Sequence, residues 1–233
     1  MGKFQIFNKA IKEGRSILTE FESKEILKQA GIPVIETRLA KTEEEAVYLS
    51  QEIGFPVALK IASPDVIHKS DSGGVKLALN HADEVKTAYN EIIESVSQQY
   101  PGILIQGVSV QKMARPGTEV IVGTNKDPQF GPVIMFGLGG IFVEILKDVS
   151  FRIIPVDRRD ALEMIKEIKG YPLLQGYRGK EPANISVLVE IILKLSSLIE
   201  KNPQIKELEL NPIVAYGDGA AAVDARIILE KDE

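Results

Sequence analysis

One segment, residues 63–76 (SPDVIHKSDSGGVK), combines the residue types needed to handle a phosphate group. It contains one imidazole, His68, and a glycine pair, Gly73–Gly74, and it lies between two segments in which apolar residues alternate. Serine hydroxyls and glycine N–H groups can donate hydrogen bonds to an anion, and Lys60 and Lys69 carry positive charge. The pattern therefore predicts a phosphate-binding loop. A loop histidine is more often simply solvated than catalytic, so the role of His68 depends on the rest of the chain.

A second group of polar residues lies in a predicted β-hairpin near the C-terminus. Residues 207–211 (ELELN) alternate between polar and apolar side chains, and residues 221–229 form a second segment of strand character. Gly217–Asp218 between them is typical of a two-residue hairpin turn. That turn fixes the predicted register of the two strands.

The register places Asn211 opposite Asp224 and Glu209 opposite Arg226. Directly opposed residues have Cβ atoms roughly 5 Å apart. An amide oxygen and a carboxylate at that separation suit Mg²⁺, which takes hard oxygen ligands and completes its shell with phosphate oxygens. The alternative is a solvated sheet face with a Glu209–Arg226 ion pair, worth about 0–1 kcal/mol. Asp224 follows an apolar segment, residues 220–223, and a carboxylate there without a partner is rare, which favours the metal.

Helical periodicity, capping residues and alternation predict the elements that position these groups. We expect helices at 4–18, after Ser23 as N-cap, after Thr42 in a capping box, at 83–99, at 160–169 and after Asn184 or Ser186; strands at 34–39, 57–61, 75–79, 103–105, 108–113, 119–123 and 132–136; and a loop at 171–181. This order predicts an α/β or α+β fold. Helices give way to strands near residue 105, so we predict two domains, 1–109 and 110–233.

Composition narrows the class of protein. The chain has 233 residues, 44% hydrophobic and 26% charged, with a formal net charge of -5 and no cysteine. These values are typical of an ordinary globular protein, argue against a general nucleic-acid binder, and exclude disulfides and zinc–thiolate sites. The sequence lacks a run of about eighteen apolar residues and an apolar signal-like start, so we expect no membrane association and a cytoplasmic location.

A glycine loop, residues 137–140 (GLGG), follows the apolar run 132–136. The dinucleotide-binding fingerprint requires a third glycine at the position that Phe142 occupies, so that interpretation fails. A tight strand–helix turn remains the plain alternative to a ligand-binding role.

Taken together, these segments resemble the ATP-grasp fold, and specifically the β subunits of ADP-forming acetyl-CoA synthetases, relatives of the succinyl-CoA synthetase β chain. The resemblance covers essentially the whole chain. Its most specific segments are residues 63–75 and 136–144 (FGLGGIFVE), supported by residues 56–60 (PVALK), 110–113 (VQKM), 117–119 (GTE) and 209–212 (ELNP) with Asp224.

The resemblance implies two subdomains with ATP or ADP between them, and a role for each matching residue. His68 would transiently carry phosphate, and Glu209 would lie beside the transfer path. The implied nucleotide-binding residues are Lys60 at the phosphates, Val110, Gln111, Lys112 and Met113 as a hinge with main-chain hydrogen bonds to adenine, and Glu119 at the ribose. Further candidates, for contacts with phosphate or with the phosphohistidine, are Gly139, Gly140, Glu144, Arg152 and Arg178. Asn211 and Asp224 would coordinate Mg²⁺. Succinate-type enzymes have a glutamate where Gln111 stands, which leaves a side-chain role there open.

The resemblance also implies a partner. Coenzyme A and the carboxylic acid would bind to a separate α subunit in an α2β2 assembly, and this chain would exchange phosphate between nucleotide and histidine. Two alternatives remain at this point. A stand-alone ATP-grasp carboxylate ligase would act through an acyl phosphate without His68, and a nucleotide-sensing subunit would bind nucleotide without turnover.

Overall fold

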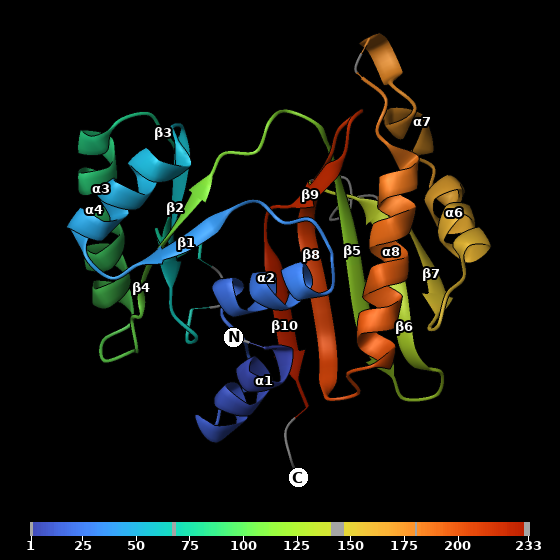
Figure 1. Ribbon diagram of the computed structural model, residues 1–233, viewed down its shortest axis with the longest axis horizontal. Helices are drawn as coiled ribbons and strands as arrows, with labels where there is room; N and C mark the ends of the chain where they lie inside the picture. The colour runs from blue at the N-terminus through green and yellow to red at the C-terminus, as the bar shows by residue number, and fades with distance from the viewer. Residues whose placement is uncertain (1, 67–68, 141–146, 180, 231–233) are drawn as a thin grey trace. The chain divides into compact units, whose positions relative to one another are not determined.

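The computed structural model describes residues 2–66, 69–140, 147–179 and 181–230 (Figure 1). Contacts divide the chain into two units. Unit 1 comprises Met1–Leu18, Glu22–Val34 and Arg115–Glu233, and unit 2 comprises Thr19–Phe21 and Ile35–Ala114. This division differs from the predicted domains, because most of the N-terminal segment packs into the core of unit 1 and the chain passes between units at 114/115 instead of 109/110.

Unit 2 is a four-stranded antiparallel sheet with two helices. The strands are β1 (Thr37–Ala40), β2 (Val57–Ala62), β3 (Val75–Leu79) and β4 (Gly107–Lys112), in the order β1-β4-β2-β3. Helices α3 (Glu43–Ile53) and α4 (Ala82–Gln99) pack on this sheet (Figure 1). Because β4 is an interior strand, a boundary at residue 109 would cut the sheet.

The predicted start of α3 after Thr42 is confirmed, although the Glu45 carboxylate accepts the N–H of Lys41 and not that of Thr42, as a capping box would require. The N–H of Glu45 donates to the Thr42 hydroxyl at 3.2 Å, which satisfies one of the free donors at the helix N-terminus. Gly54, with φ of 84°, then ends the helix, a conformation that favours glycine. The chain is thereby turned into β2, all of whose residues are buried.

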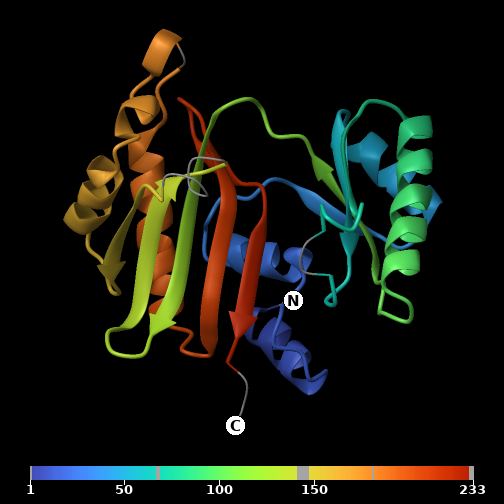
Figure 2. The ribbon, with the colours of Figure 1, turned by 180° about the vertical axis from the view of Figure 1, so that it is seen from behind.

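Unit 1 is built on a six-stranded antiparallel sheet. The strands are β5 (Thr118–Asp127), β6 (Gly131–Leu138), β7 (Val149–Ile153), β8 (Ile205–Ala215), β9 (Ala220–Ala222) and β10 (Ala225–Leu229), in the order β10-β8-β5-β6-β7 with β9 paired to β8. The helical segments are α1 (Lys3–Lys12), most of α2 (Glu20–Gln29), α6 (Arg158–Glu167), α7 (Tyr171–Leu174), α8 (Ile185–Glu200) and the short η1 (Tyr177–Gly179). Figure 2 shows that the helices of unit 1 lie on one face of this sheet and leave the other face of the sheet uncovered by them.

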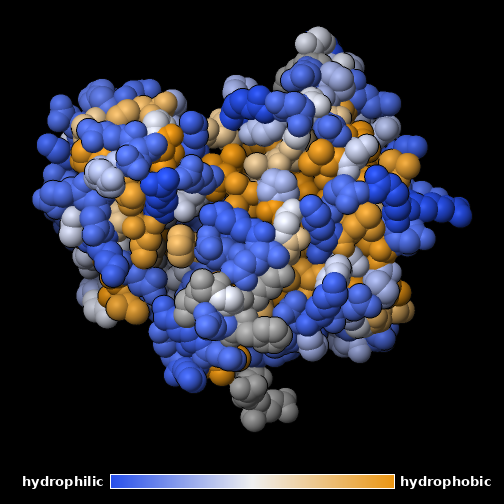
Figure 3. Space-filling model, in the orientation of Figure 1, coloured by the Kyte–Doolittle hydropathy of each residue, from blue (hydrophilic) through white to orange (hydrophobic). Residues whose placement is uncertain are grey.

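The core of unit 1 lies between this sheet and its helices. Eight residues of α8 are buried against it, and Asn184, one of the two predicted caps, accepts the N–H of Val187 at 3.2 Å. Figure 3 shows hydrophobic side chains gathered on the unit 1 part of the surface that carries α8. The partly buried Ile185 and Leu193 belong to α8.

Some predicted elements were wrong. Helix α2 begins at Glu20, so Ser23 is a buried residue inside it and does not cap it. The first helix ends at Lys12, residues 103–105 form no strand, and strand β7 was not predicted. The 171–181 segment contains α7 and η1. In the described part of the chain, no helix is long and apolar enough to cross a membrane.

Candidate functional site

Three charged residues meet inside unit 2. Lys60 Nζ lies 3.1 Å from one carboxylate oxygen of Glu20, and Lys69 Nζ lies 2.7 Å from the other. The side chains of Glu20, Lys60 and Lys69 are only 5%, 7% and 17% exposed. One carboxylate thus contacts two ammonium groups, and the formal charges of these three largely buried side chains sum to +1.

The loop that leads into this cluster is fixed by its own hydrogen bonds. The carbonyl of Lys69 accepts from the Ser72 hydroxyl and from the N–H of Gly74, both at 2.8 Å, and the N–H of Gly73 donates to Ser70 at 3.2 Å. In the described conformation these donors are used inside the loop, and the binding of an anion by this segment stays a prediction. His68 lies outside the described residues.

The glycine pair has a steric reason instead. Gly73 has φ of 68°, and a Cβ there would lie 2.7 Å from the Ser95 hydroxyl. A Cβ on Gly74 would lie 2.6 Å from a methyl of Ile61 and 2.9 Å from the Lys69 carbonyl. Only glycine lets the loop pack this closely against β2.

The predicted hinge residues form the end of β4 and the residue after it. The N–H of Lys112 donates to the Glu36 carbonyl at 3.2 Å, and that of Met113 to the Pro56 carbonyl at 3.1 Å. These two donors are therefore engaged within unit 2 in this structure, and main-chain hydrogen bonds from the segment 110–113 to adenine stay a prediction. Val110 and Gln111 are buried, with the Thr37 hydroxyl 3.4 Å from the Gln111 amide oxygen.

In unit 1 the predicted ribose residue and the glycine loop lie together. The N–H of Gly139 donates to the Glu119 carbonyl at 2.8 Å, and a Cβ on Gly139 would lie 3.0 Å from that of Glu119. Gly140 has φ of 65°, and a Cβ there would lie 3.3 Å from a Glu119 carboxylate oxygen. Sequence positions twenty residues apart are thus brought to one end of β5 and β6.

The predicted hairpin register is confirmed. Glu209 pairs with Arg226 between β8 and β10, and Ile213 pairs with Ala222 between β8 and β9. The N–H of Tyr216 donates to the Gly219 carbonyl at 2.8 Å, which closes the turn around residues 217–218. This register, continued between β9 and β10, places Asp224 across from Asn211.

Asn211 and Pro212 form a β-bulge in β8 on the side that faces β5. Val120 pairs with Ile213 and Val122 with Leu210, so two residues of β8 oppose Ile121 alone. A bulge tolerates a proline, which lacks the N–H that a strand ladder needs, and it redirects neighbouring side chains. Asn211 is exposed there.

A second charged cluster lies beside this bulge. Arg226 donates to Glu207 at 2.6 Å and to Glu209 at 2.7 Å. Asn211 donates its amide N–H to the other Glu209 oxygen at 3.1 Å. The side chains of Glu207, Glu209 and Arg226 are 29–38% exposed, and one guanidinium shared by two carboxylates gives a formal charge of -1.

The donor set of the hairpin fits a magnesium ion. The Asn211 amide nitrogen is engaged with Glu209, so its amide oxygen would be the atom to face a cation. Asp224, one of whose oxygens accepts the N–H of Ala225 at 2.8 Å, would supply a carboxylate. In the described ranges, no group of three or more His, Cys, Asp or Glu side chains could hold a metal. One carboxylate and one amide oxygen match the sparse protein coordination of Mg²⁺ that is completed by nucleotide phosphates.

The remaining candidates divide. Arg178 is exposed, has φ of 53°, and stacks over Tyr177 with 5.3 Å to the ring centroid. Arg152 pairs with Glu167 of α6 at 2.9 Å. Since Arg152 is in register with the buried Ile134, it lies on the helix-covered face of the sheet, opposite to Glu209. The phosphate contact expected of Arg152 stays a prediction, and Glu144 lies outside the described residues.

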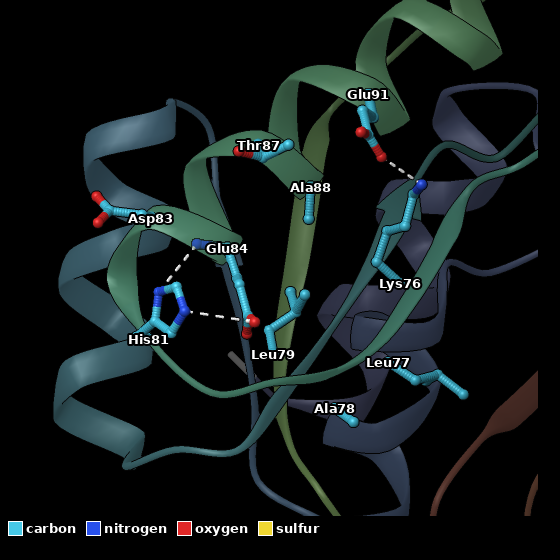
Figure 4. A pocket seen from close by; sticks show the side chains of 10 residues that line it. All are labelled: Lys76, Leu77, Ala78, Leu79, His81, Asp83, Glu84, Thr87, Ala88 and Glu91. Carbon is cyan, nitrogen blue, oxygen red and sulfur yellow. Dashed lines mark hydrogen bonds and ion pairs between the residues drawn. The ribbon is translucent and has the colours of Figure 1, made fainter.

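The surface of each unit has a hollow, and only the one in unit 1 lies beside predicted site residues. One, of about 200 Å³, lies on the uncovered sheet face of unit 1 beside Glu207 and Glu209, with Gly123, Met135 and Phe151 among its lining. The other, of about 420 Å³, lies between β3 and α4 of unit 2 (Figure 4). It contains none of the predicted site residues, and its charged groups pair locally, as His81 does with Glu84.

Sequence reasoning missed Glu20 and Glu207. The sequence pattern places Glu207 on the polar face of the hairpin, but it does not predict the hydrogen bond that Glu207 accepts from Arg226. Glu20 gave a weaker signal: it is the first acidic residue of a segment, 20–25 (EFESKE), that reads as an ordinary charged helix start. Only the tertiary contact of its carboxylate with Lys60 and Lys69 distinguishes it.

Comparison with known proteins identifies the family. The model of an ATP-grasp domain family matches residues 9–229. The β subunit of ADP-forming acetate–CoA ligase I from Pyrococcus furiosus is 54% identical over 225 residues, covering 97% of each chain. This chain belongs to the ATP-grasp family of ADP-forming acetate–CoA ligase β subunits.

Two solved structures of a member of this family are closely similar. Acetyl-coenzyme A synthetase 1 of Ca. Korarchaeum cryptofilum, in complex with coenzyme A, Ca-AMPCP and HgCl+, superposes with a TM-score of 0.96 at 51% identity, over 98% of this chain and 100% of that one. A second structure of that enzyme contains coenzyme A and Mg-AMPPCP, with a phosphohistidine segment pointing towards the nucleotide binding site. It has a TM-score of 0.87 at 48% identity and covers 98% of this chain and 100% of that one. The predicted family, fold class and ligase class are confirmed.

Proposed function

We propose that this chain is the nucleotide-binding subunit of an ADP-forming acetyl-CoA synthetase. It exchanges a phosphoryl group between ADP or ATP and a histidine during the reaction acyl-CoA + ADP + phosphate ⇌ carboxylic acid + CoA + ATP. Within this family, the observation that carries the proposal is the buried Lys60–Glu20–Lys69 cluster, whose net positive charge lies next in sequence to His68.

The chemistry requires little covalent machinery. In the direction that consumes ATP, a nitrogen of the neutral His68 imidazole attacks the γ-phosphorus, and the bond to the β–γ bridging oxygen breaks to release ADP. In the other direction, the phosphoryl group passes from His68 to ADP. Lys60 neutralises charge on the nucleotide phosphates, because a buried ammonium interacts strongly with an anion.

Unit 1 provides the remaining contacts. Glu119 binds the ribose hydroxyls, and Gly139 and Gly140 let backbone come close to the nucleotide. Asn211 and Asp224 would hold Mg²⁺, which when bound would neutralise phosphate charge and orient the transferred group. Glu209, held by Arg226 and Asn211, lies beside the phosphoryl-transfer path.

The subunit acts with an α subunit that binds coenzyme A and the carboxylic acid. The similar β subunit of Pyrococcus furiosus is named as one part of such a ligase, which supports this division of labour. The acid is therefore selected by the partner. We place the protein in the cytoplasm, where an enzyme that uses ADP and coenzyme A finds both.

Mass spectrometry tests the proposal. The chain is incubated with Mg-ATP, with and without its α partner, as wild type and as His68→Asn. We expect one acid-labile, base-stable phosphate on the peptide that contains His68 of the wild type, and none on the variant.

If ATP binds but no phosphate forms even with the partner present, His68 is not a carrier and the proposal is overturned. Ligase activity that survives His68→Asn would indicate transfer through an acyl phosphate. Binding without any turnover would indicate a nucleotide sensor.

A further inference from the structure

Glu20 has no role in the proposed reaction so far, yet its carboxylate contacts two lysines and is almost fully buried. It is the first residue of α2, and the N-terminus of a helix favours a negative charge. Each of its two oxygens contacts a different lysine, at 3.1 Å for Lys60 and 2.7 Å for Lys69. The two lysines belong to different parts of the fold, since Lys60 lies on β2 and Lys69 lies in the loop before β3.

This arrangement is an inefficient way to gain stability. Charged groups lose hydration when they are buried, and apolar residues of similar size would often stabilise a core as well or better. A shared carboxylate does serve one purpose well. It holds two ammonium groups at a fixed separation, with side chains that are only 7% and 17% exposed.

Lys69 is also fixed through its backbone. Its carbonyl accepts the Ser72 hydroxyl and the Gly74 N–H, and the Gly74 carbonyl in turn accepts the N–H of Ile61 on β2 at 2.7 Å. The side chain of Lys69 adds a second, indirect link between this loop and β2, because Lys69 contacts Glu20 and Glu20 contacts Lys60 of β2. His68 is the residue that precedes Lys69 in the chain.

We propose that Glu20 is a positioning residue for phosphoryl transfer: by binding Lys60 and Lys69 at once, it sets the loop that follows His68 against the phosphate-binding lysine. This inference rests on the proposed function. It assigns to Glu20 an effect on the rate of transfer that is larger than its effect on nucleotide binding, because the adenine, ribose and magnesium contacts do not involve it.

The test is a double-mutant cycle on the complex with the α subunit. Wild type, Glu20→Gln, Lys69→Met and the double variant are mixed with radiolabelled Mg-ATP, and single-turnover phosphorylation of His68 is followed at saturating nucleotide. We expect a rate about tenfold lower in each single variant, and the double variant no slower than the slower single variant, since both changes cut the same link. The dissociation constant for ATP should change less than threefold in Glu20→Gln.

Two further variants separate positioning from folding. Glu22→Gln, on the same helix, removes a partner of Arg15 in unit 1 and should leave the transfer rate within a factor of two. Glu20→Asp keeps the charge but is one methylene shorter, and should restore part of the rate.

The outcomes are distinct. No phosphorylation of the wild type overturns the proposed function, and this inference with it. Phosphorylated wild type with an unchanged rate in Glu20→Gln overturns the inference alone. So does a double variant whose loss equals the product of the two single losses, because Glu20 and Lys69 would then act independently.

Discussion

The two units hold charged clusters of opposite design. In unit 2, one carboxylate is shared by two ammonium groups, and the three side chains are only 5–17% exposed. In unit 1, one guanidinium is shared by two carboxylates, and the side chains are 29–38% exposed. The first cluster has a net positive charge and the second a net negative charge.

This difference matches the ligands expected at each place. A desolvated positive cluster attracts the phosphates of a nucleotide, whereas a negative, partly hydrated sheet face next to Asn211 and Asp224 attracts a hydrated divalent cation. The difference in burial also predicts which cluster is sensitive to substitution. Broken pairs are costly inside a protein and nearly neutral at its surface.

The largest effect on activity should come from the cation side of the comparison. Asp224→Asn removes the only carboxylate of the proposed magnesium pair, so we expect phosphorylation of His68 to slow about 100-fold or more, with a thermal midpoint close to that of wild type. Asp218→Asn, at the exposed turn of the same hairpin, is the matched control and should keep the wild-type rate. A normal rate in Asp224→Asn would remove this residue from the site.

The largest effect on stability should come from the buried cluster. Lys60→Met removes one of the two lysines that contact Glu20. We expect the free energy of unfolding, measured in urea, to fall by about 3 kcal/mol relative to wild type. Glu207→Gln, which removes one of the two carboxylates on Arg226, should cost less than about 1 kcal/mol. Equal losses in the two variants would contradict the distinction between the clusters.

The packing around one glycine in each unit, Gly74 and Gly123, can be compared in the same way. Gly74→Ala places a Cβ 2.6 Å from Ile61, so we expect a loss of about 1–3 kcal/mol and a slower transfer from the displaced loop. Gly123→Ala, on the sheet of unit 1, meets Met135 at an ordinary 3.5 Å and should stay within about 0.5 kcal/mol of wild type. The urea midpoints of both variants test this comparison. A loss in Gly123→Ala as large as that in Gly74→Ala would show that the unit 2 loop is not packed more tightly than the sheet of unit 1.

The smallest expected effect concerns pH. At the hairpin turn, a hydrogen bond from Arg115 at 2.6 Å lowers the pKa of Asp218. Because the folded pKa lies below the unfolded one, the stabilisation is present above the ordinary carboxyl range and is lost as the pH falls through the lowered folded pKa. Both side chains are more than 60% exposed, so the effect should be small. The thermal midpoint of Asp218→Asn should lie slightly below wild type at pH 7 and converge with it in acid.

The sequence by itself determined the parts of the molecule whose signals are local. The cap at Thr42, and Asn184 as one of two candidate caps for α8, were predictable because a helix start depends on side chains within one turn. The hairpin register, and with it the pairing of Glu209 with Arg226, followed from a two-residue turn and a period of two. The motif residues likewise identified the family.

Tertiary structure alone decided what depends on contacts between distant segments. The pairing of Glu20 with Lys60 joins residues forty positions apart, and the faces of β7 that carry Arg152 and Phe151 depend on pairing with β6. The hydrogen bonds that the N–H groups of Lys112 and Met113 donate likewise depend on acceptors far away in the sequence, which no short pattern specifies. Residue types show which groups could bind a phosphate, but the fold determines which of them are already bonded to the protein itself.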